Sequence, residues 1–66
     1  MLYIRNNIMT IRELREKTGL SQSKFAELLH IPVRTIQVWE INQRKPPIYV
    51  NELIEKVLRY EGHIKE

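Results

Sequence analysis

Glycine and proline divide this chain into segments that each have the length and pattern of a short helix. Gly19 separates the first segment from the second, the Ile31-Pro32 pair separates the second from the third, and Pro46-Pro47 precede the last. Glycine suits the left-handed end of a helix, and a residue before proline is pushed out of the α region. No segment carries a convincing strand pattern. The sequence therefore predicts an all-α fold, a compact bundle of four or five short helices.

The first predicted helix begins with a capping box, Thr10-Ile11-Arg12-Glu13. In such a box the Thr10 hydroxyl accepts from a free helix amide, and the Glu13 carboxylate accepts from the amide of Thr10. Ile11 and Leu14 share one face, and Gly19 ends the helix. Ser21 is the N-cap of a second helix, whose broad apolar stripe is formed by Phe25, Ala26, Leu28 and Leu29.

The third helix follows after about three residues, because Pro32 is well placed at or beside a first helical position. It is predicted from about Val33 to Asn42, with Ile36, Trp39 and Glu40 facing inward.

A fourth helix is predicted from Ile48 to about Tyr60. Its apolar stripe, which we expect to be mostly core, consists of Val50, Leu53, Ile54, Val57 and Leu58. Tyr49, Leu53 or Val57 could also contact a second copy or a partner. We divide the chain into an N-terminal arm (1–9), one domain (10–60) and a C-terminal tail (61–66).

The residue types that most catalytic sites need are scarce. The chain has no Cys, no Asp and two His, and His30 and His63 lie far apart in the sequence. These counts exclude a disulfide and a thiolate metal site, and they leave no nucleophilic triad or cluster of metal ligands. Gly19 and Gly62 are the only glycines, too few for a phosphate-cradling loop. We therefore expect a binding protein, not an enzyme, with no metal and no cofactor.

The charge of +3 is distributed unevenly. Residues 1–50 hold eight Lys or Arg against four Glu, whereas residues 51–66 hold three against four. The positive part suggests a surface for a polyanion. No run approaches the roughly 18 apolar residues of a membrane span, and residues 1–10 do not resemble an export leader, so we expect a cytoplasmic protein without a membrane partner.

Two short helices with a tight turn between them can place the second helix in the major groove of DNA. Residues 20–40 (LSQSKFAELLHIPVRTIQVWE) resemble the helix-turn-helix of the phage-repressor-like family, also called the xenobiotic-response-element family. Ala26 matches the small residue where the two helices cross, and Ile31, Ile36 and Trp39 match the apolar positions that hold them together. The resemblance covers about Thr10 to Leu58 and implies a lambda-repressor-like DNA-binding domain.

The resemblance also implies roles for individual residues. The base-reading positions of the third helix are occupied by Val33, Arg34, Gln37 and Val38. Arg can donate two hydrogen bonds to guanine, Gln can pair with adenine, and Val can contact the thymine methyl group. Phosphate contacts are implied for Ser21, Gln22, Thr35, Arg44 and Lys45. Arg15 and Glu40 match a family pair in which an arginine of the first helix meets a glutamate of the recognition helix.

Three positions depart from the family pattern. His30 and Asn42 stand where glycine is usual, and both residue types tolerate left-handed geometry. Ile41 stands where a polar residue is usual, so we expect it to contact DNA sugar or a partner protein.

The leading hypothesis is a sequence-specific, double-stranded DNA-binding transcriptional regulator, a repressor, that acts as a homodimer with the helix of residues 33–42 in the major groove. A second hypothesis is the antitoxin of a toxin-antitoxin pair, which binds operator DNA and uses the Leu2 to Ile8 arm or the Ile41 side to bind its toxin protein. A third is a protein-interaction domain that has kept the fold and lost DNA binding.

Overall fold

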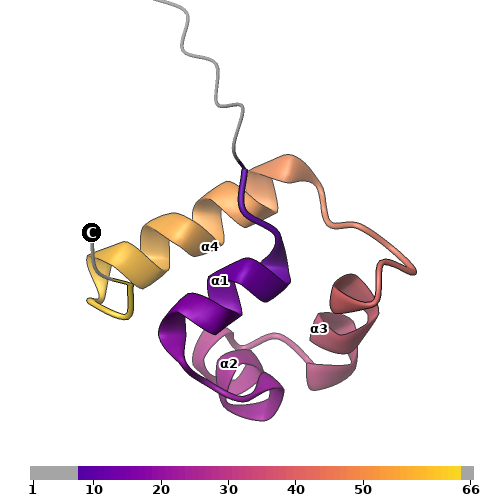
Figure 1. Cartoon of the computed structure of the whole chain (residues 1–66), viewed down its shortest axis with the longest axis horizontal. Coiled ribbons are helices and arrows are strands. Elements are labelled where there is room, and N and C mark those ends of the chain that lie inside the picture. The colour runs from indigo at the N-terminus through magenta and orange to yellow at the C-terminus, as the bar shows by residue number, and fades with distance from the viewer. Residues whose placement is uncertain (1–7, 65–66) are drawn as a thin grey trace, which may run out of the picture.

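Four helices follow one another in the computed structural model, which describes residues 8–64 (Figure 1). They are α1 (Ile11–Thr18), α2 (Gln22–Leu29), α3 (Val33–Glu40) and α4 (Ile48–Tyr60). Within the described residues there is no strand, so the all-α prediction is confirmed. Of the predicted arm, Ile8 and Met9 are described, and residues 1–7 lie outside the described part.

The first two helices begin where the sequence predicts. The Thr10 hydroxyl accepts a hydrogen bond of 3.1 Å from the Glu13 amide, and the Thr10 amide donates one of 2.8 Å to the Glu13 carboxylate. The Ser21 hydroxyl accepts one of 3.1 Å from the Lys24 amide. These side chains satisfy amides that would otherwise lack a partner in the first turn, which confirms both predicted N-caps.

Each helix is followed within two residues by a residue in the left-handed conformation: Gly19, His30, Asn42 and Gly62, with φ angles of 76°, 58°, 64° and 81°. At the end of α3 the Asn42 amide donates to the Trp39 carbonyl, and the Gln43 amide donates to the Val38 carbonyl, both at 3.2 Å. This is the Schellman arrangement, which cannot continue as a helix. It corrects the predicted end of the third helix, because α3 stops at Glu40 and Asn42 belongs to the turn.

The core lies where α1 packs against α3 and α4, with α2 packed on α3 (Figure 1). The largest side chains that are fully buried there are Phe25, Leu14, Ile36 and Leu58. Ala26 is 3% exposed, which agrees with a close crossing of α2 and α3. The core therefore takes residues from all four helices, and it fixes how α3 sits on the rest of the domain.

The buried face of α4 differs from the predicted stripe. Ile54 and Leu58 are buried, but Leu53 and Val57 are 55% and 42% exposed. Asn51 and Glu55 are buried in their place. The Asn51 amide donates a hydrogen bond of 2.8 Å to the Met9 carbonyl, and Glu55 accepts one of 3.0 Å from Arg59. These hydrogen bonds offset the cost of burying two polar side chains. The buried face of α4 can therefore include Asn51 and Glu55 in place of Leu53 and Val57.

Two residues outside the helices, one before α1 and one after α4, also pack with the core. Ile64 is 5% exposed and belongs to the core. Gly62 makes this possible, because its left-handed turn lets the His63 amide donate to the Leu58 carbonyl at 2.8 Å. Met9 packs against the core as well. In the described part of the chain, no helix has the length and apolar character needed to cross a membrane.

Candidate nucleic-acid interface

The turn between α2 and α3 consists of residues 30–32. His30 adopts φ 58° and ψ 37°, and its amide donates to the Glu27 carbonyl at 3.2 Å. The next amide, of Ile31, donates to the Ala26 carbonyl at 3.0 Å, and the Ile31 side chain packs against the core. These contacts fix the direction in which α3 leaves the turn. The left-handed geometry expected at His30 is confirmed.

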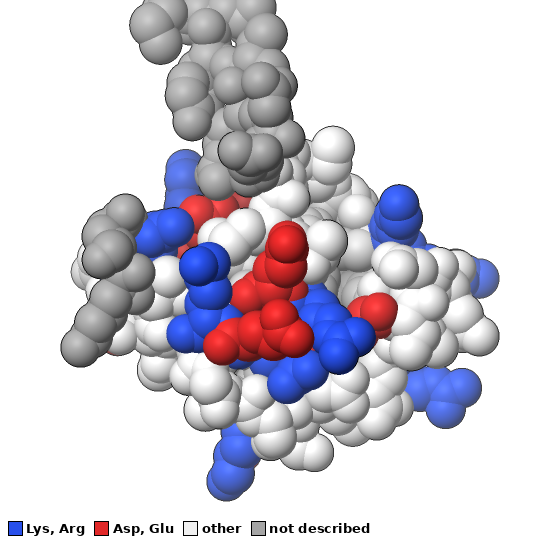
Figure 2. All heavy atoms as spheres, viewed as in Figure 1, with Lys and Arg blue, Asp and Glu red and all other residues white. Residues whose placement is uncertain are grey.

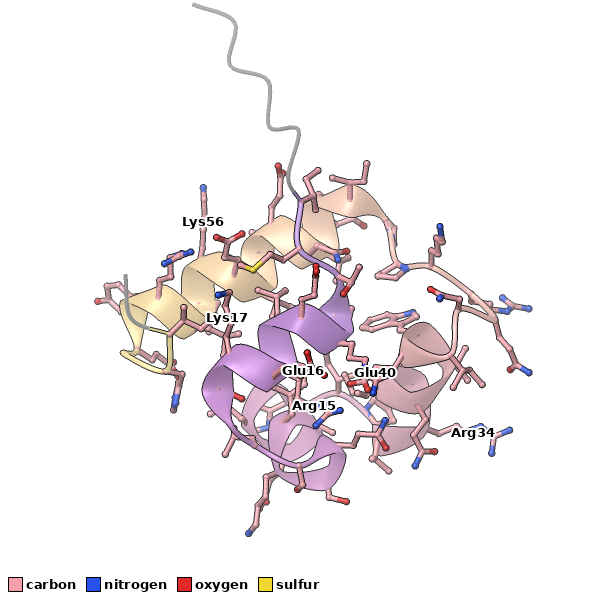
Figure 3. All side chains as sticks on the ribbon, in the orientation of Figure 1. Arg15, Glu16, Lys17, Arg34, Glu40 and Lys56 are labelled. Atoms are coloured by element: carbon pink, nitrogen blue, oxygen red, sulfur yellow. The ribbon has the colours of Figure 1, made fainter. Side chains whose placement is uncertain are left out.

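One face of α3 lies against the core and the opposite face is open. Ile36 is fully buried and Trp39 packs partly buried against the core. Of the four predicted base-reading residues, Arg34 and Gln37 are exposed, Val33 is 37% exposed, and Val38 is half-buried. Arg34 projects away from the body of the protein at the edge of α3 (Figure 3). These four residues therefore share a helix with two core residues, and Arg34 and Gln37 are the two that are clearly exposed.

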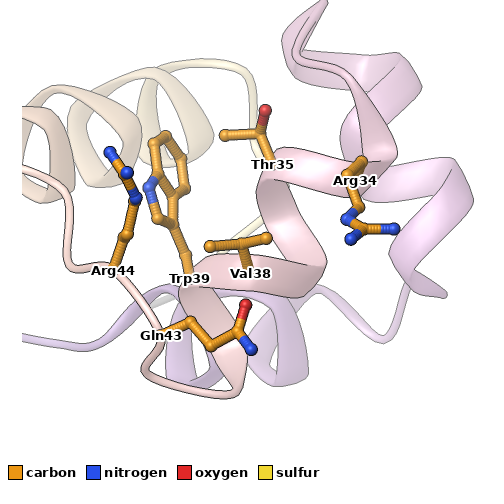
Figure 4. Close-up of a pocket in the computed structure, with 6 residues that line it drawn as sticks. All are labelled: Arg34, Thr35, Val38, Trp39, Gln43 and Arg44. Atoms are coloured by element: carbon orange, nitrogen blue, oxygen red, sulfur yellow. The ribbon is translucent and has the colours of Figure 1, made fainter.

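A shallow hollow of about 490 Å³ runs along α3 and the loop that follows it (Figure 4). It is lined by Arg34, Thr35, Val38, Trp39, Gln43 and Arg44. The two arginines border it from different segments, one from the first turn of α3 and one from the loop, and the Trp39 ring lies beside Arg44 (Figure 4). Two guanidinium groups, a hydroxyl and an amide around an apolar floor can donate hydrogen bonds to phosphates and base edges.

The predicted phosphate-contact residues lie at three places. Thr35 and Arg44 border the hollow, whereas Lys45 is exposed beside a second hollow on the other side of Trp39. Ser21 is exposed at the start of α2, where its hydroxyl caps the helix. Gln22 is half-buried, and its side-chain amide donates a hydrogen bond of 3.0 Å to the Glu40 carboxylate.

The structure contains the ion pair expected between Arg15 and Glu40. The Arg15 Nε and Nη2 atoms donate to the two oxygens of Glu40 at 2.7 and 3.0 Å, and Nη1 donates to the Leu20 carbonyl at 3.0 Å. The two side chains, 18% and 4% exposed, meet between α1 and α3 (Figure 3). This two-pronged geometry is the strong form of an arginine–carboxylate contact.

The ion pair shifts the pKa values of both partners. The hydrogen bond to Glu40 raises the pKa of Arg15, an effect that outweighs the loss of solvation. For Glu40, burial by itself would raise the pKa, but the hydrogen bonds from Arg15 and Gln22 and the positive charge of Arg15 lower it below its ordinary value. Glu40 is therefore a buried carboxylate that stays ionised.

Basic groups stand on the α3 side of the molecule with few acidic groups near them. In Figure 2 blue atoms project at several parts of the rim and also lie beside the red atoms over α1, and those on the side of α3 have few red atoms near them. Arg34, Arg44 and Lys45 are all exposed, and no described carboxylate forms an ion pair with any of them. Free cations on one surface favour contact with a polyanion.

Two contacts at this surface were not predicted from the sequence. Gln43 lines the hollow, although the sequence indicates only a polar loop at that point. Gln22 bonds to Glu40, although the two residues are far apart in the chain. Neither has a sequence pattern that predicts its contact. Within the described residues no group of three or more His, Cys, Asp or Glu is placed to hold a metal ion.

Comparison with known proteins identifies the family of this chain. Residues 11–62 match a family model described as helix-turn-helix. No curated protein and no solved structure gives a significant match. The matched residues include all four helices and most of the chain, and the family is one of DNA-binding regulators. The chain therefore belongs to the Cro/C1-type helix-turn-helix family.

Proposed function

We propose that this chain is a transcriptional repressor that binds a specific operator in double-stranded DNA. One observation carries the proposal: Arg34 and Gln37 are exposed on the face of α3 opposite the buried Ile36. An α-helix fits the major groove of B-DNA, where each base pair presents a distinct pattern of donors and acceptors. The fork of Arg34 suits guanine and the amide of Gln37 suits adenine. In this proposal Val33 and Val38 contact thymine methyl groups.

Contacts with the DNA backbone position α3 in the groove. Arg44 and Lys45 follow α3 in the loop, and Thr35 lies beside Arg44 at the hollow. Ser21 and Gln22 lie at the start of α2, where free amides at the positive end of the helix dipole favour a phosphate. Such contacts fix register and orientation but carry no direct sequence information.

A single domain of this size offers few base contacts, so we propose that it acts as a homodimer. Two-fold symmetry places two copies of α3 in successive major grooves, about 34 Å apart on a palindromic operator. Tyr49, Leu53 and Val57 of α4 are exposed and are available for the contact between copies.

Selection of bound sequences from a random DNA pool tests this proposal, because it reports binding, site length and symmetry together. Two variants then separate base reading from backbone contact. Arg34→Ala should lower discrimination between the selected operator and random DNA by about 1 to 3 kcal/mol, since a bidentate base contact is lost. Lys45→Ala should weaken binding to every sequence alike and reduce the salt slope by about one.

The outcomes that contradict the proposal are specific. Equal losses on operator and random DNA for Arg34→Ala would remove its role in base reading. Binding that does not weaken between about 50 and 200 mM salt would argue against phosphate contact and favour a protein-interaction domain that has lost DNA binding.

A second candidate function is that of an antitoxin, which binds both operator DNA and a toxin protein. Ile41 favours it, because this apolar side chain directly after α3 is 63% exposed. Co-purification with the product of an adjacent, co-transcribed gene would support this function. A solitary gene, or unchanged capture of the partner by Ile41→Ser, would count against the Ile41 side as the toxin-binding surface.

A further inference from the structure

The helices α2 and α3 are joined at both ends. The turn of residues 30–32 connects the last residue of α2 with the first residue of α3. At the other end, which we call the open end, Gln22 is the first residue of α2 and Glu40 is the last residue of α3. The Gln22 Nε2 atom donates to the Glu40 Oε1 atom across this end, at 3.0 Å. The hydrogen bond thus closes the pair of helices opposite the turn.

Glu40 is a fixed acceptor for this bond. Arg15 holds both of its oxygens from α1, and Arg15 is itself fixed by the Leu20 carbonyl in the segment before α2. The Glu40 side chain is 4% exposed, so water cannot easily replace the Gln22 amide. A hydrogen bond to a charged, desolvated acceptor is stronger than one at the surface. Gln22 therefore links α2 directly to a carboxylate that α1 already holds in place.

We propose that Gln22 is a positioning residue that fixes the orientation of α3 relative to α2, and with it the discrimination between DNA sequences. The inference rests on the proposed function and refines it. In the proposed function the start of α2 contacts a phosphate through its free amides, whereas the side chain of Gln22 donates to Glu40. A short rod hinged at the turn tilts when its open end is released. Hydrogen bonds from Arg34 and Gln37 to base edges require placement within about 0.5 Å and 10–20°. Contacts with phosphates carry no direct sequence information, so they do not by themselves favour the operator over random DNA.

This role differs in its consequences from a side-chain contact between Gln22 and a phosphate. If Gln22 held a phosphate, its loss would weaken binding to operator and random DNA alike. If Gln22 holds α3, its loss lowers affinity for the operator while leaving affinity for random DNA nearly unchanged.

The test replaces Gln22 with methionine, which has a similar length and shape but no donor. Gln22→Met should lower the ratio of operator to random-DNA affinity roughly tenfold, the effect of one charge-assisted hydrogen bond. Ser23→Ala is the matched control, because Ser23 is exposed in the same turn of α2 and has no hydrogen bond to α3 among those of the described residues. Its ratio should stay within about twofold of the parent value. Gln22→Ala, measured in the same way, guards against misfolding caused by the methionine side chain.

A second readout needs no DNA. Titration of the Glu40 carboxyl carbon by NMR should give a higher pKa in Gln22→Met than in the parent protein, because a hydrogen bond that lowers the pKa of Glu40 is lost. An unchanged Glu40 pKa would overturn the inference, whatever the protein does to DNA. Equal losses on operator and random DNA would overturn it in favour of a phosphate contact. A parent protein without sequence preference would overturn the proposed function, and with it the claim that Gln22 affects DNA discrimination. The titration would still decide, independently of DNA, whether Gln22 holds Glu40.

Discussion

At the scale of single residues, the carboxylate of Glu40 joins α3 to α1 and α2 through its hydrogen bonds. It is almost completely buried yet ionised, and three donors from Arg15 and Gln22 satisfy it. A buried ion pair adds little net stability compared with apolar residues of the same volume, because desolvation offsets the attraction. Removal of one partner is different, since it leaves the other charge buried without compensation.

We predict that Arg15→Met destabilises the protein by about 3 kcal/mol, because Glu40 would keep only Gln22 as a donor. A chain of this size has a total stability of about 3–5 kcal/mol, so the variant should retain only about 0–2 kcal/mol. Urea unfolding followed by circular dichroism measures the change.

Arg12→Met is the matched control for this prediction. Arg12 lies in the same helix and pairs with Glu16, but the two side chains are 63% and 58% exposed. An exposed pair of this kind contributes less than about 0.5 kcal/mol. Similar losses of stability in both variants would show that burial of the Arg15–Glu40 pair has no special effect.

The sequence indicates some of these residue contacts and hides others. The Arg15–Glu40 pair follows from the resemblance to a known family, because the two positions match a pair in its pattern. The Gln22–Glu40 bond does not follow from spacing or composition. The bond joins two long side chains that come within reach of each other only after α1, α2 and α3 have packed together.

At the scale of elements, left-handed residues end the helices and set the directions of the chain. His30 and Asn42 adopt φ angles of 58° and 64°, a conformation that costs residues other than glycine about 1 kcal/mol or more. The turns tolerate this cost because hydrogen bonds of the Schellman type satisfy the last carbonyls of α2 and α3. The direction of α3 therefore depends on the local conformation of one residue, His30.

We predict that His30→Gly stabilises the protein by about 0.5 to 1 kcal/mol, because glycine adopts the left-handed conformation without strain. The gain is limited by the greater freedom of glycine in the unfolded chain. Thermal unfolding measures it as a higher Tm. Glu27→Gly, at an exposed helical position of α2, should instead lose about 1 kcal/mol. A lower Tm for His30→Gly than for the parent would contradict the strain assigned to this turn.

The sequence predicts where a helix begins when its capping residues lie within one turn of each other. It predicts which face of a helix is buried less well. The capping box at Thr10 and the N-cap at Ser21 involve residues within one turn, so the sequence suffices for both. The face of α4 depends on the surroundings. Periodicity favours Leu53 and Val57 for the core, whereas the structure buries Asn51, which bonds to the Met9 carbonyl 42 positions away. Partners so distant in sequence leave no periodic pattern.

At the scale of the whole molecule, a single helix serves both the core and the candidate interface. Ile36 and Trp39 fix α3 to the domain, and Arg34 and Gln37 face outward from the same helix. The rest of the protein, including the core residues of α1 and α4, holds this helix in one orientation. Family resemblance was enough to predict this arrangement, but not the hollow beside Trp39, which also requires the loop of residues 43 and 44.

The account depends most on the claim that the outer face of α3 enters DNA. The direct measurement is an NMR titration of the labelled full chain with the duplex that the random-pool selection returns. We predict that the largest shifts occur at Arg34, Gln37 and Val38 and in the loop at Arg44 and Lys45, with small shifts along α1. Shifts concentrated on the exposed face of α4, at Tyr49, Leu53 and Val57, with α3 unchanged, would contradict the account.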